Sequence, residues 1–499
     1  MKMRFRILAL LLSLLMVVPI FASCDTENDT SDSQGIQNTQ STENTTSASE
    51  RPEIETKLEY APSIPKKNYN DEFYLLIQPG SNIFEYHWVE ESGNDLLSQA
   101  IFERQQKVYS HLGVEVVGIE AEHYADYVEP FKNRIKNKDG TVDALITHYF
   151  FGVDSFVSGN YFADFNDYLQ IDLSADYWNS EIMNDLSIDG ETFLGKSDFN
   201  ILCTYVVMFN KDMMEKYDDE LDETVYEMVD NYHWTLDKMI SLANLVYIDT
   251  TGDGKTIDDT FGIASEQDAA ANGFLLSSDI SMISPDDSGN YVITVYNDIN
   301  KEKTTAVVEK LHELSKSNYG WFWPWAGEYP IEFQEGTALL TWVNTNQLPR
   351  YLEYDLNFGV LPYPMYDENQ KDVGYRSLQY GGFIGIPTYL RNPQMVGDTL
   401  EMLAYYSENV NTAYYEKLLG KQVADTTHDS RMLQIVWDSI GTDFAQTFYG
   451  SFESTDFFHM MARLTPEDAT QNVASFIKSR ETTVNKLVRK LLIDIKNRE

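Results

Sequence analysis

The apolar run FYLLI at residues 73–77 opens the segment whose pattern decides the fold. After it, apolar residues recur at helical spacing behind Asn94 or Asp95, either of which can cap a helix, and Gly113 ends that pattern. A strand, a second helix and a third strand follow, at residues 114–119, 124–137 and 142–147. This β-α-β-α-β order predicts an α/β fold with a mostly parallel sheet flanked by helices.

Two loops of this segment are candidates for ligand contact. Mostly parallel sheets bind ligands at the carboxyl ends of their strands. The loop after the first predicted strand carries Glu85 and Trp88, and the loop after the third carries Tyr149 and Phe150. We therefore predict that these four side chains bind a ligand.

A second informative stretch, GWFWPWAGEYPIEFQEGTALLTWVN at residues 320–344, holds four of the eight tryptophans. Indole rings occur where a flat apolar face with one N–H donor is wanted, in a core, an interface or a ligand cleft. Core packing explains at least one of these rings, and a ligand cleft would explain why they gather. The ligand contacts predicted from this stretch are Trp321, Trp323, Trp325, Trp342 and Asn344.

The N-terminus has the pattern of an export signal. Lys2, Arg4 and Arg6 precede an apolar run over residues 7–21, and small residues come before Cys24. This arrangement resembles a bacterial lipobox, so we predict a signal peptide at residues 1–23 and lipidation of Cys24. The alternative is an ordinary signal peptide followed by a chance cysteine.

Residues 24–68 are rich in Ser, Thr, Asn, Gln and Glu and lack apolar periodicity, which predicts a disordered tether. The chain has 499 residues, enough for two or three domains, and its hydrophobic content of 43% can build a core. A formal net charge of -42 disfavours nucleic acid and anionic membrane surfaces as partners of the whole molecule and favours solubility outside the cell.

Sequence motifs of common enzymes are absent. The eight histidines are dispersed, and no HExxH, paired-cysteine spacing, GxSxG elbow, Walker loop or GxGxxG fingerprint occurs. With 79 acidic residues, a carboxylate pair suited to glycoside hydrolysis would arise in any fold, so it carries no information. We therefore expect a protein that is not an enzyme.

One loop has part of a calcium-binding pattern. DTTGDGK at residues 249–255 places oxygen ligands at positions 1, 3 and 5 and glycine at position 6, but position 12 is Thr260 instead of glutamate. A polar turn is the alternative. No cofactor is required by the sequence, and a calcium ion here would be structural, with the ligands Asp249, Thr251, Asp253 and Asp259.

Several short motifs occur in a familiar order along the body of the chain. They are DALI at residues 143–146, FADF at 162–165, FNKD at 209–212, HWTLD at 233–237, FQEGTAL at 333–339 and FGVLPYP at 358–364. In this order the chain resembles the extracellular solute-binding proteins of bacterial ABC importers, in the carbohydrate-binding group that includes maltose-binding protein, and most of all Gram-positive lipoproteins of that group. The resemblance runs from about residue 69 to the C-terminus.

This resemblance implies a two-lobe, periplasmic-binding-protein-like (type II) α/β fold with the ligand in an interlobe cleft. By position, the first lobe would take residues 69–200 and 356–418, and the second would take residues 201–355 and 419–499. Family members stack aromatic rings on sugar faces and hydrogen-bond the hydroxyl groups. Carried over by position, the residues implied at the cleft are Tyr149, Trp342, Asn344, Tyr380 and Gly381.

The function that follows from the resemblance is capture of a mono- or oligosaccharide outside the cell and its delivery to the permease subunits of an ABC transporter. The protein would be a monomer on the outer face of the cell membrane, held there by its lipid anchor. Two alternatives stay open: a binding protein for a peptide or another non-sugar solute, and a surface-anchored enzyme that degrades glycans.

Overall fold

The computed structural model describes residues 64–78, 86–121, 126–200, 203–267, 269–286, 288–324, 331–354, 356–414 and 427–498. The chain divides into two compact units, Met1–Tyr60 and Ala61–Glu499, and only the second contains described residues. The predicted signal peptide, nearly all of the predicted tether and the predicted lipidation site Cys24 lie outside the described residues. Glu85 and Trp325 also lie outside them.

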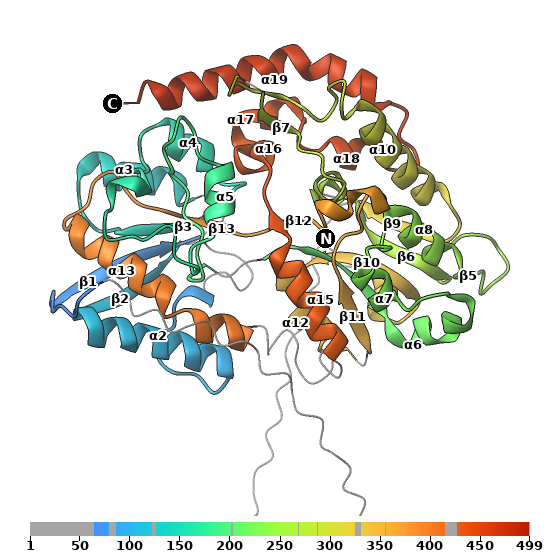
Figure 1. Cartoon of the computed structure of the whole chain (residues 1–499), viewed down its shortest axis with the longest axis horizontal. Helices are drawn as coiled ribbons and strands as arrows, with labels where there is room; N and C mark the ends of the chain where they lie inside the picture. The colour runs from blue at the N-terminus through green and yellow to red at the C-terminus, as the bar shows by residue number, and fades with distance from the viewer. Residues whose placement is uncertain are drawn as a thin grey trace, which may run out of the picture. The chain divides into compact units, whose positions relative to one another are not determined.

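The first sheet has the strand order β13-β3-β1-β2 (Figure 1). Strand β1 is parallel to both β2 and β3, whereas β13 is antiparallel to β3. The predicted β-α-β-α-β order is therefore confirmed, with a late strand added at the edge. The strands are β1 (Asp71–Ile77), β2 (Val114–Glu120), β3 (Ala144–His148) and β13 (Gly382–Gly385), and the intervening helices are α2 (Leu96–Leu112) and α3 (Val128–Asn137).

Local sequence signals fix the ends of α2. Asp95 is its N-cap, and the carboxylate accepts hydrogen bonds from the backbone N–H groups of Leu97 and Ser98. Gly113 follows the helix in the left-handed conformation at φ 64°, which glycine adopts without steric penalty. The predicted helix boundaries at Asp95 and Gly113 are confirmed.

Both faces of the first sheet are covered, as is usual for parallel strands. Phe73, Leu75 and Ile77 of β1 pack in one cluster with residues of α2 and α13 (Pro393–Tyr405). Leu76, which points to the opposite face, belongs to a different cluster together with Phe131 of α3. Strand β3 alternates in the same way, with Leu145 in one cluster and Ala144 and Ile146 in the other, so it too lies between two packed layers.

The second sheet has the strand order β11-β4-β10-β6-β5, and β9 also pairs with β6. The pairings β10–β6 and β6–β9 are parallel, whereas β10–β4, β11–β4 and β5–β6 are antiparallel. The strands are β4 (Tyr205–Asn210), β5 (Tyr247–Ile248), β6 (Thr260–Gln267), β9 (Gly320–Pro324), β10 (Ala338–Asn344) and β11 (Phe358–Leu361).

One expected lobe boundary needs correction. The family resemblance implied that residues 356–418 belong to the first lobe, but β11 hydrogen-bonds to β4 of the second sheet, with Val360 opposite Met208. The chain re-enters the first sheet only at β13. The assignment of residues 358–361 was wrong because the FGVLPYP motif marks a strand and says nothing of the sheet it joins.

Helices surround the second sheet, and several bridge toward the first. The helices described in and around this lobe are α6 (Lys211–Met214), α7 (Val225–Asp230), α8 (Leu236–Asn244), α9 (Gly273–Ser277), α10 (Lys301–Lys316), α11 (Ile331–Gln334), α12 (Leu348–Tyr351), α15 (Thr427–Asp438), α16 (Phe444–Thr447), α17 (Tyr449–Phe452), α18 (Met460–Leu464) and α19 (Val473–Lys496). On the first lobe lie α4 (Val153–Ser158) and α5 (Ser180–Asp185), and two small ladders pair β7 (Ile283–Pro285) with β8 (Tyr291–Ile293) and β12 (Ser377–Leu378) with β14 (Ile440–Gly441).

The two sheets are joined where the chain passes between them. Thr204 forms a bridge with Gln379, and the backbone N–H of Tyr380 donates to the carbonyl of Cys203 at 2.6 Å. Helix α19 contacts both α4 and β8, and it runs along one margin of the folded unit (Figure 1). Among the described residues, no helix is both long enough and apolar enough to cross a bilayer.

Candidate functional site

The candidate site begins at the carboxyl end of β3. All five residues of this strand are buried, and the strand ends at His148. The backbone N–H of His148 donates to the side chain of Gln78 at 2.6 Å, which ties this end to the end of β1. The next residues, Tyr149 and Phe150, therefore leave the sheet at a fixed point on its carboxyl edge.

Three of the predicted residues meet around the imidazole of His148. Its ring centroid lies 4.0 Å from that of Tyr149, 5.3 Å from that of Phe150 and 4.9 Å from that of Tyr380. Tyr380 comes from the segment that crosses between the sheets. The structure thus brings together two ring positions predicted from the first lobe and one implied by the family resemblance.

Aromatic rings of the second lobe and the C-terminal region close the other side of this cluster. The Tyr149 ring lies 6.3 Å from Phe458, and the Phe150 ring lies 4.9 Å from Tyr449. Tyr380 also contacts Tyr205 of β4, at 5.4 Å between centroids. We call His148, Tyr149, Phe150, Tyr380 and Phe458 the junction cluster.

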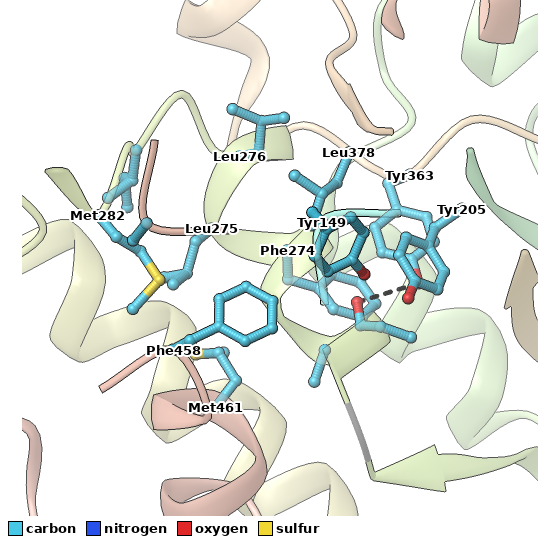
Figure 2. Packing of buried hydrophobic residues seen from close by; sticks show 14 of the residues in the cluster. Tyr149, Tyr205, Phe274, Leu275, Leu276, Met282, Tyr363, Leu378, Phe458 and Met461 are labelled. Atoms are coloured by element: carbon cyan, nitrogen blue, oxygen red, sulfur yellow. Dashed lines mark hydrogen bonds between the residues drawn. The ribbon is translucent and has the colours of Figure 1, made fainter. Parts of the chain in front are cut away.

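Figure 2 shows the buried packing into which Tyr149 projects. Phe274 stacks on Tyr363 with centroids 4.6 Å apart, and the Tyr363 hydroxyl donates to the carbonyl of Ala270 at 3.3 Å. The larger buried cluster around these rings includes residues of both sheets, so the two lobes share one apolar contact region here. Tyr149 is 1% exposed, so its ring is shielded from solvent in this structure.

Buried polar atoms without hydrogen-bond partners gather beside these rings. The Gln379 side chain is fully buried, and neither its Nε2 nor its Oε1 has a partner among the described residues. The Nε2 of Gln446 donates to the backbone carbonyl of Gln379 at 3.0 Å, and the Oε1 of Gln446 has no partner among the described residues. The remaining unpaired atoms of this kind near the junction are Asn272 Oδ1, Asn344 Oδ1 and His148 Nε2.

Such atoms are unusual, because most buried polar groups in proteins are hydrogen-bonded and an unpaired one costs about 1–3 kcal/mol. The side chains that carry them are all neutral amides or imidazole. Several such atoms close to one aromatic cluster are what a site for an uncharged, hydroxyl-rich solute would provide.

Electrostatics keep His148 neutral. Complete burial, together with the nearby Lys196 ammonium, lowers the pKa of His148 from 6.5 to about 3. Its Nδ1 accepts the backbone N–H of Phe150 at 3.3 Å, so the ring proton sits on Nε2. Nε2–H is therefore a donor that no described residue accepts.

Lys196 supports the backbone at the same place. Its Nζ donates to the Gly382 carbonyl at 2.9 Å, and Asn200 Nδ2 donates to the same oxygen at 2.8 Å. Burial lowers the pKa of Lys196 to about 8. These two bonds hold the buried Gly381 and Gly382 at the start of β13, next to Tyr380.

The predicted tryptophan cluster is not one group in space. In β9, Trp321 and Trp323 point to one face of the sheet, and Phe322 points to the other. Phe322 stacks on Trp342 at 5.3 Å, whereas Trp321 packs on Phe261 at 5.3 Å. The alternation of side chains along a strand separates rings that are neighbours in the sequence.

Trp321 and Trp323 contact each other with ring centroids 6.0 Å apart, whereas Trp342 packs with Phe322. Trp342 is 5% exposed, and its Nε1 donates to the carbonyl of Glu266 at 2.9 Å. Trp323 donates its Nε1 to the buried carboxylate of Glu332 at 3.0 Å. Ligand contact by Trp321, Trp323 and Trp342 stays a prediction, and only Trp342 lies on the face that carries the junction cluster.

Of the remaining predicted residues, Asn344 lies near the junction cluster and Trp88 lies away from it. Asn344 ends β10 opposite Tyr205, within the junction region, with its Oδ1 unpaired. Trp88 lies against β2, where its Nε1 donates to the Val116 carbonyl at 2.8 Å and its ring covers Gly118 so closely that a Cβ there would lie 2.6 Å from it. The structure therefore joins Asn344 to the junction cluster and does not join Trp88.

The loop predicted to bind calcium satisfies its carboxylates internally. Asp249 accepts the backbone N–H groups of Gly252 and Gly254, at 2.6 and 3.0 Å. Asp259 accepts those of Thr250 and Thr256, at 3.0 and 2.9 Å. No group of three or more histidine, cysteine or acidic residues that could hold a metal ion occurs within the described ranges. These contacts fit the polar-turn alternative, and calcium binding stays a prediction.

Five residues of the site were not predicted from the sequence: His148, Gln379, Gln446, Asn272 and Phe458. Each comes from a different segment of the chain, and none sits in a local motif of its own. The one usable signal was position, because His148 and Gln379 directly precede the predicted residues Tyr149 and Tyr380. Long-range packing supplies the rest.

Residues 100–421 match the family model described as a bacterial extracellular solute-binding protein. The chain belongs to this family. No curated protein matches the chain closely enough to count as a relative. Members of the extracellular solute-binding family are binding proteins, and this family fits a structure whose candidate site is built from rings and neutral polar groups.

Solved structures share the fold at low sequence identity. The GacH receptor of Streptomyces glaucescens has a TM-score of 0.54 and 14% identity, over 86% of this chain and 99% of that one. The galacto-N-biose-/lacto-N-biose I-binding protein of Bifidobacterium longum has a TM-score of 0.55 and 12% identity, over 84% and 97%. An ABC substrate-binding protein from Listeria monocytogenes has a TM-score of 0.53 and 13% identity, over 83% and 98%. The two-lobe solute-binding fold predicted from the sequence is confirmed.

Proposed function

We propose that this solute-binding protein captures a carbohydrate, a mono- or oligosaccharide, outside the cell and delivers it to the permease of an ABC importer. The observation that carries the proposal is the junction cluster, where aromatic rings from both lobes lie beside neutral, unpaired amide and imidazole groups. A sugar offers apolar C–H faces for such rings and hydroxyl groups for such donors and acceptors.

Proteins of the same fold support this substrate class. The GacH receptor binds acarbose, the Listeria protein binds cycloalternan, and the Bifidobacterium protein belongs to an ABC transporter and binds lacto-N-biose. Their low identity to this chain carries no individual contact over. The ligands bound by these proteins of the same fold make saccharides the first class of solute to test.

Capture requires the lobes to part and close again. Tyr149 and Phe458 touch across the junction in this structure, so solute entry must separate them, and rings that close on a bound sugar would replace their mutual contact. A ligand that binds the closed arrangement better shifts the population toward it, and a permease can sense that state.

We further propose how the protein is anchored and what happens to the bound solute. The protein would be a lipoprotein anchored at Cys24 to the outer face of the cell membrane, with residues 24–68 as the tether, and it would act as a monomer. The bound solute would be released unaltered, so the protein would not be an enzyme. Mass spectrometry of the secreted mature chain tests the anchor, because a diacylated N-terminal cysteine adds a defined mass to the first peptide.

A thermal-shift screen of the full chain tests the substrate class. We expect neutral saccharides to raise the melting temperature, because a ligand at a hundred times its dissociation constant stabilises the folded state by about 2.7 kcal/mol. Peptides serve as the comparison set. A shift with peptides and none with saccharides would replace the sugar by a peptide, and conversion of a polysaccharide to shorter products would indicate an enzyme instead.

A further inference from the structure

Helix α19 carries a line of cations on the face turned away from the core. Lys478, Lys486, Arg489 and Lys496 are all exposed. At 100° per residue these four positions fall within about 80° of one another around the helix axis. The residues that α19 buries lie on the opposite side: Val473, Phe476, Ile477, Val484, Val488, Leu491 and Ile495. We call the exposed line the basic stripe.

The basic stripe contains no acidic residue. Thr482, Asn485 and Ile493 occupy its remaining positions, and Ile493 is 56% exposed. The two acidic residues of the helix, Glu481 and Asp494, lie to either side of it, and Asp494 pairs with Lys490 at 2.5 Å. The whole chain has 79 acidic against 37 basic residues, so a solvated face of average composition would be dominated by carboxylates.

These four cations have no ion-pair partner among the described residues, unlike other cations at the same helix. Arg480 lies over the Phe476 ring at 3.6 Å and donates to the Thr455 carbonyl, and Arg498 pairs with Glu191 at 2.7 Å. Within the part of the chain that the structure describes, none of the four stripe cations makes an ion pair or a side-chain hydrogen bond. Packing therefore explains Arg480 and Arg498 and leaves the basic stripe unexplained.

We propose that the basic stripe docks the protein on an anionic phospholipid surface. The stripe spans about 27 Å along a regular helix, since each residue adds about 1.5 Å. Helix α19 runs along the margin of the folded unit, with its stripe uncovered by other described elements (Figure 1). A straight, exposed line of lysine and arginine heads, with the apolar Ile493 between Arg489 and Lys496, suits lipid headgroups, which form an extended anionic layer.

The charge of the rest of the molecule makes this docking directional. A net charge of -42 repels the protein from an anionic bilayer in most orientations. An approach with α19 toward the bilayer brings a line of four cations within the screening length of about 8–10 Å. If Cys24 carries lipid, the tether raises the local concentration of the stripe at the membrane, so weak intrinsic binding is enough. The consequence is a preferred orientation of the solute-binding body.

Vesicle flotation tests the proposal. The mature chain with Cys24→Ala, which removes the acylation site, is mixed at low salt with vesicles of phosphatidylglycerol and phosphatidylcholine or of phosphatidylcholine alone. We expect binding to the anionic vesicles only, loss of this binding at high salt, and about tenfold weaker binding for Lys486→Glu/Arg489→Glu.

A matched control carries the same change of net charge elsewhere. Lys66 and Lys216 are also exposed and form no ion pair with another described residue, so Lys66→Glu/Lys216→Glu should bind vesicles nearly as the parent does. Circular dichroism and solute binding report whether each variant stays folded and functional. Equal vesicle binding by the two double variants, or none by the parent at low salt, would overturn the proposal. Impaired solute delivery by the α19 variant without any vesicle binding would also overturn it and assign the stripe to an acidic protein partner.

Discussion

The ring of Tyr149, at the carboxyl edge of the first sheet, lies 6.3 Å from the ring of Phe458, which comes from the C-terminal region that packs on the second lobe. Both rings are buried within the junction cluster, each 1% exposed. If the lobes part as proposed, a solute with apolar faces can replace the contact between these two rings.

Removal of the Tyr149 ring is expected to weaken solute binding. Tyr149→Ala should lower the affinity for the saccharide found by screening by tenfold or more, or about 1.4 kcal/mol, because one stacking face is lost. Isothermal titration calorimetry measures this. Tyr149→Phe keeps the ring and is the control. Unchanged affinity of the folded Tyr149→Ala variant would remove Tyr149 from the site.

Replacement of Gln379 separates a binding role from a packing role. Gln379→Met has nearly the same shape but no unpaired polar atoms, so the ligand-free protein should gain about 1–3 kcal/mol in the free energy of unfolding. Its affinity for the solute should fall, because a donor and an acceptor are gone. Chemical denaturation and calorimetry measure the two effects on the same sample.

Gln370 offers the matched control for that experiment. Its side chain is buried and fully paired: it donates to the Ser277 carbonyl at 2.7 Å and accepts the Tyr366 N–H at 3.3 Å. Gln370→Met should therefore destabilise the protein and leave affinity unchanged. If Gln379→Met is as destabilising as Gln370→Met, then Gln379 is paired in solution and does not serve the site.

The first lobe could be predicted from the sequence, and the second only in part. Short-range signals were enough for α2, because Asp95 and Gly113 determine its ends within a few residues. The partner of β11 could not be read from residues 358–361, because pairing with β4 depends on segments far away in the chain. The same limit applies to the site: Tyr149 was predicted from a loop position and Tyr380 from the family resemblance, but Gln446 becomes a neighbour of Gln379 only through folding.

The free energy of unfolding below pH 6.5 should depend on His148. Burial lowers the pKa of His148 from 6.5 in the unfolded chain to about 3. Between these two values the unfolded state binds the proton and the folded state does not, so the stability of the parent falls as the pH drops from 6.5 toward 3. In His148→Asn, whose Oδ1 can replace Nδ1 as the acceptor for Phe150, this contribution is absent.

The comparison must be made as a difference between the two proteins. Burial raises the pKa of both Asp143 and Asp443 from 3.8 to about 6, and a raised carboxyl pKa makes stability fall as the pH rises through that window. These groups are common to parent and variant and cancel in the difference. Urea midpoints across this pH range should show the parent losing stability relative to His148→Asn as acid is added. A constant difference would mean that His148 is solvated in the folded state.

The loop at residues 249–260 provides a prediction about metal removal. Because Asp249 and Asp259 already accept four backbone N–H groups, we expect the same melting temperature in calcium and in a chelator. Differential scanning calorimetry checks this. A rise in the melting temperature with calcium that Asp253→Ala abolishes would instead establish the calcium site predicted from the sequence.

The account as a whole rests on reversible capture of an uncharged saccharide at the junction cluster. Its most direct test is calorimetric titration of the full chain with the saccharide selected by screening, followed by chromatography of the recovered ligand. We predict saturable binding of one saccharide per chain, lost in Tyr149→Ala, with the ligand recovered intact. Absence of binding to any neutral saccharide, or recovery of a cleaved product, would contradict it.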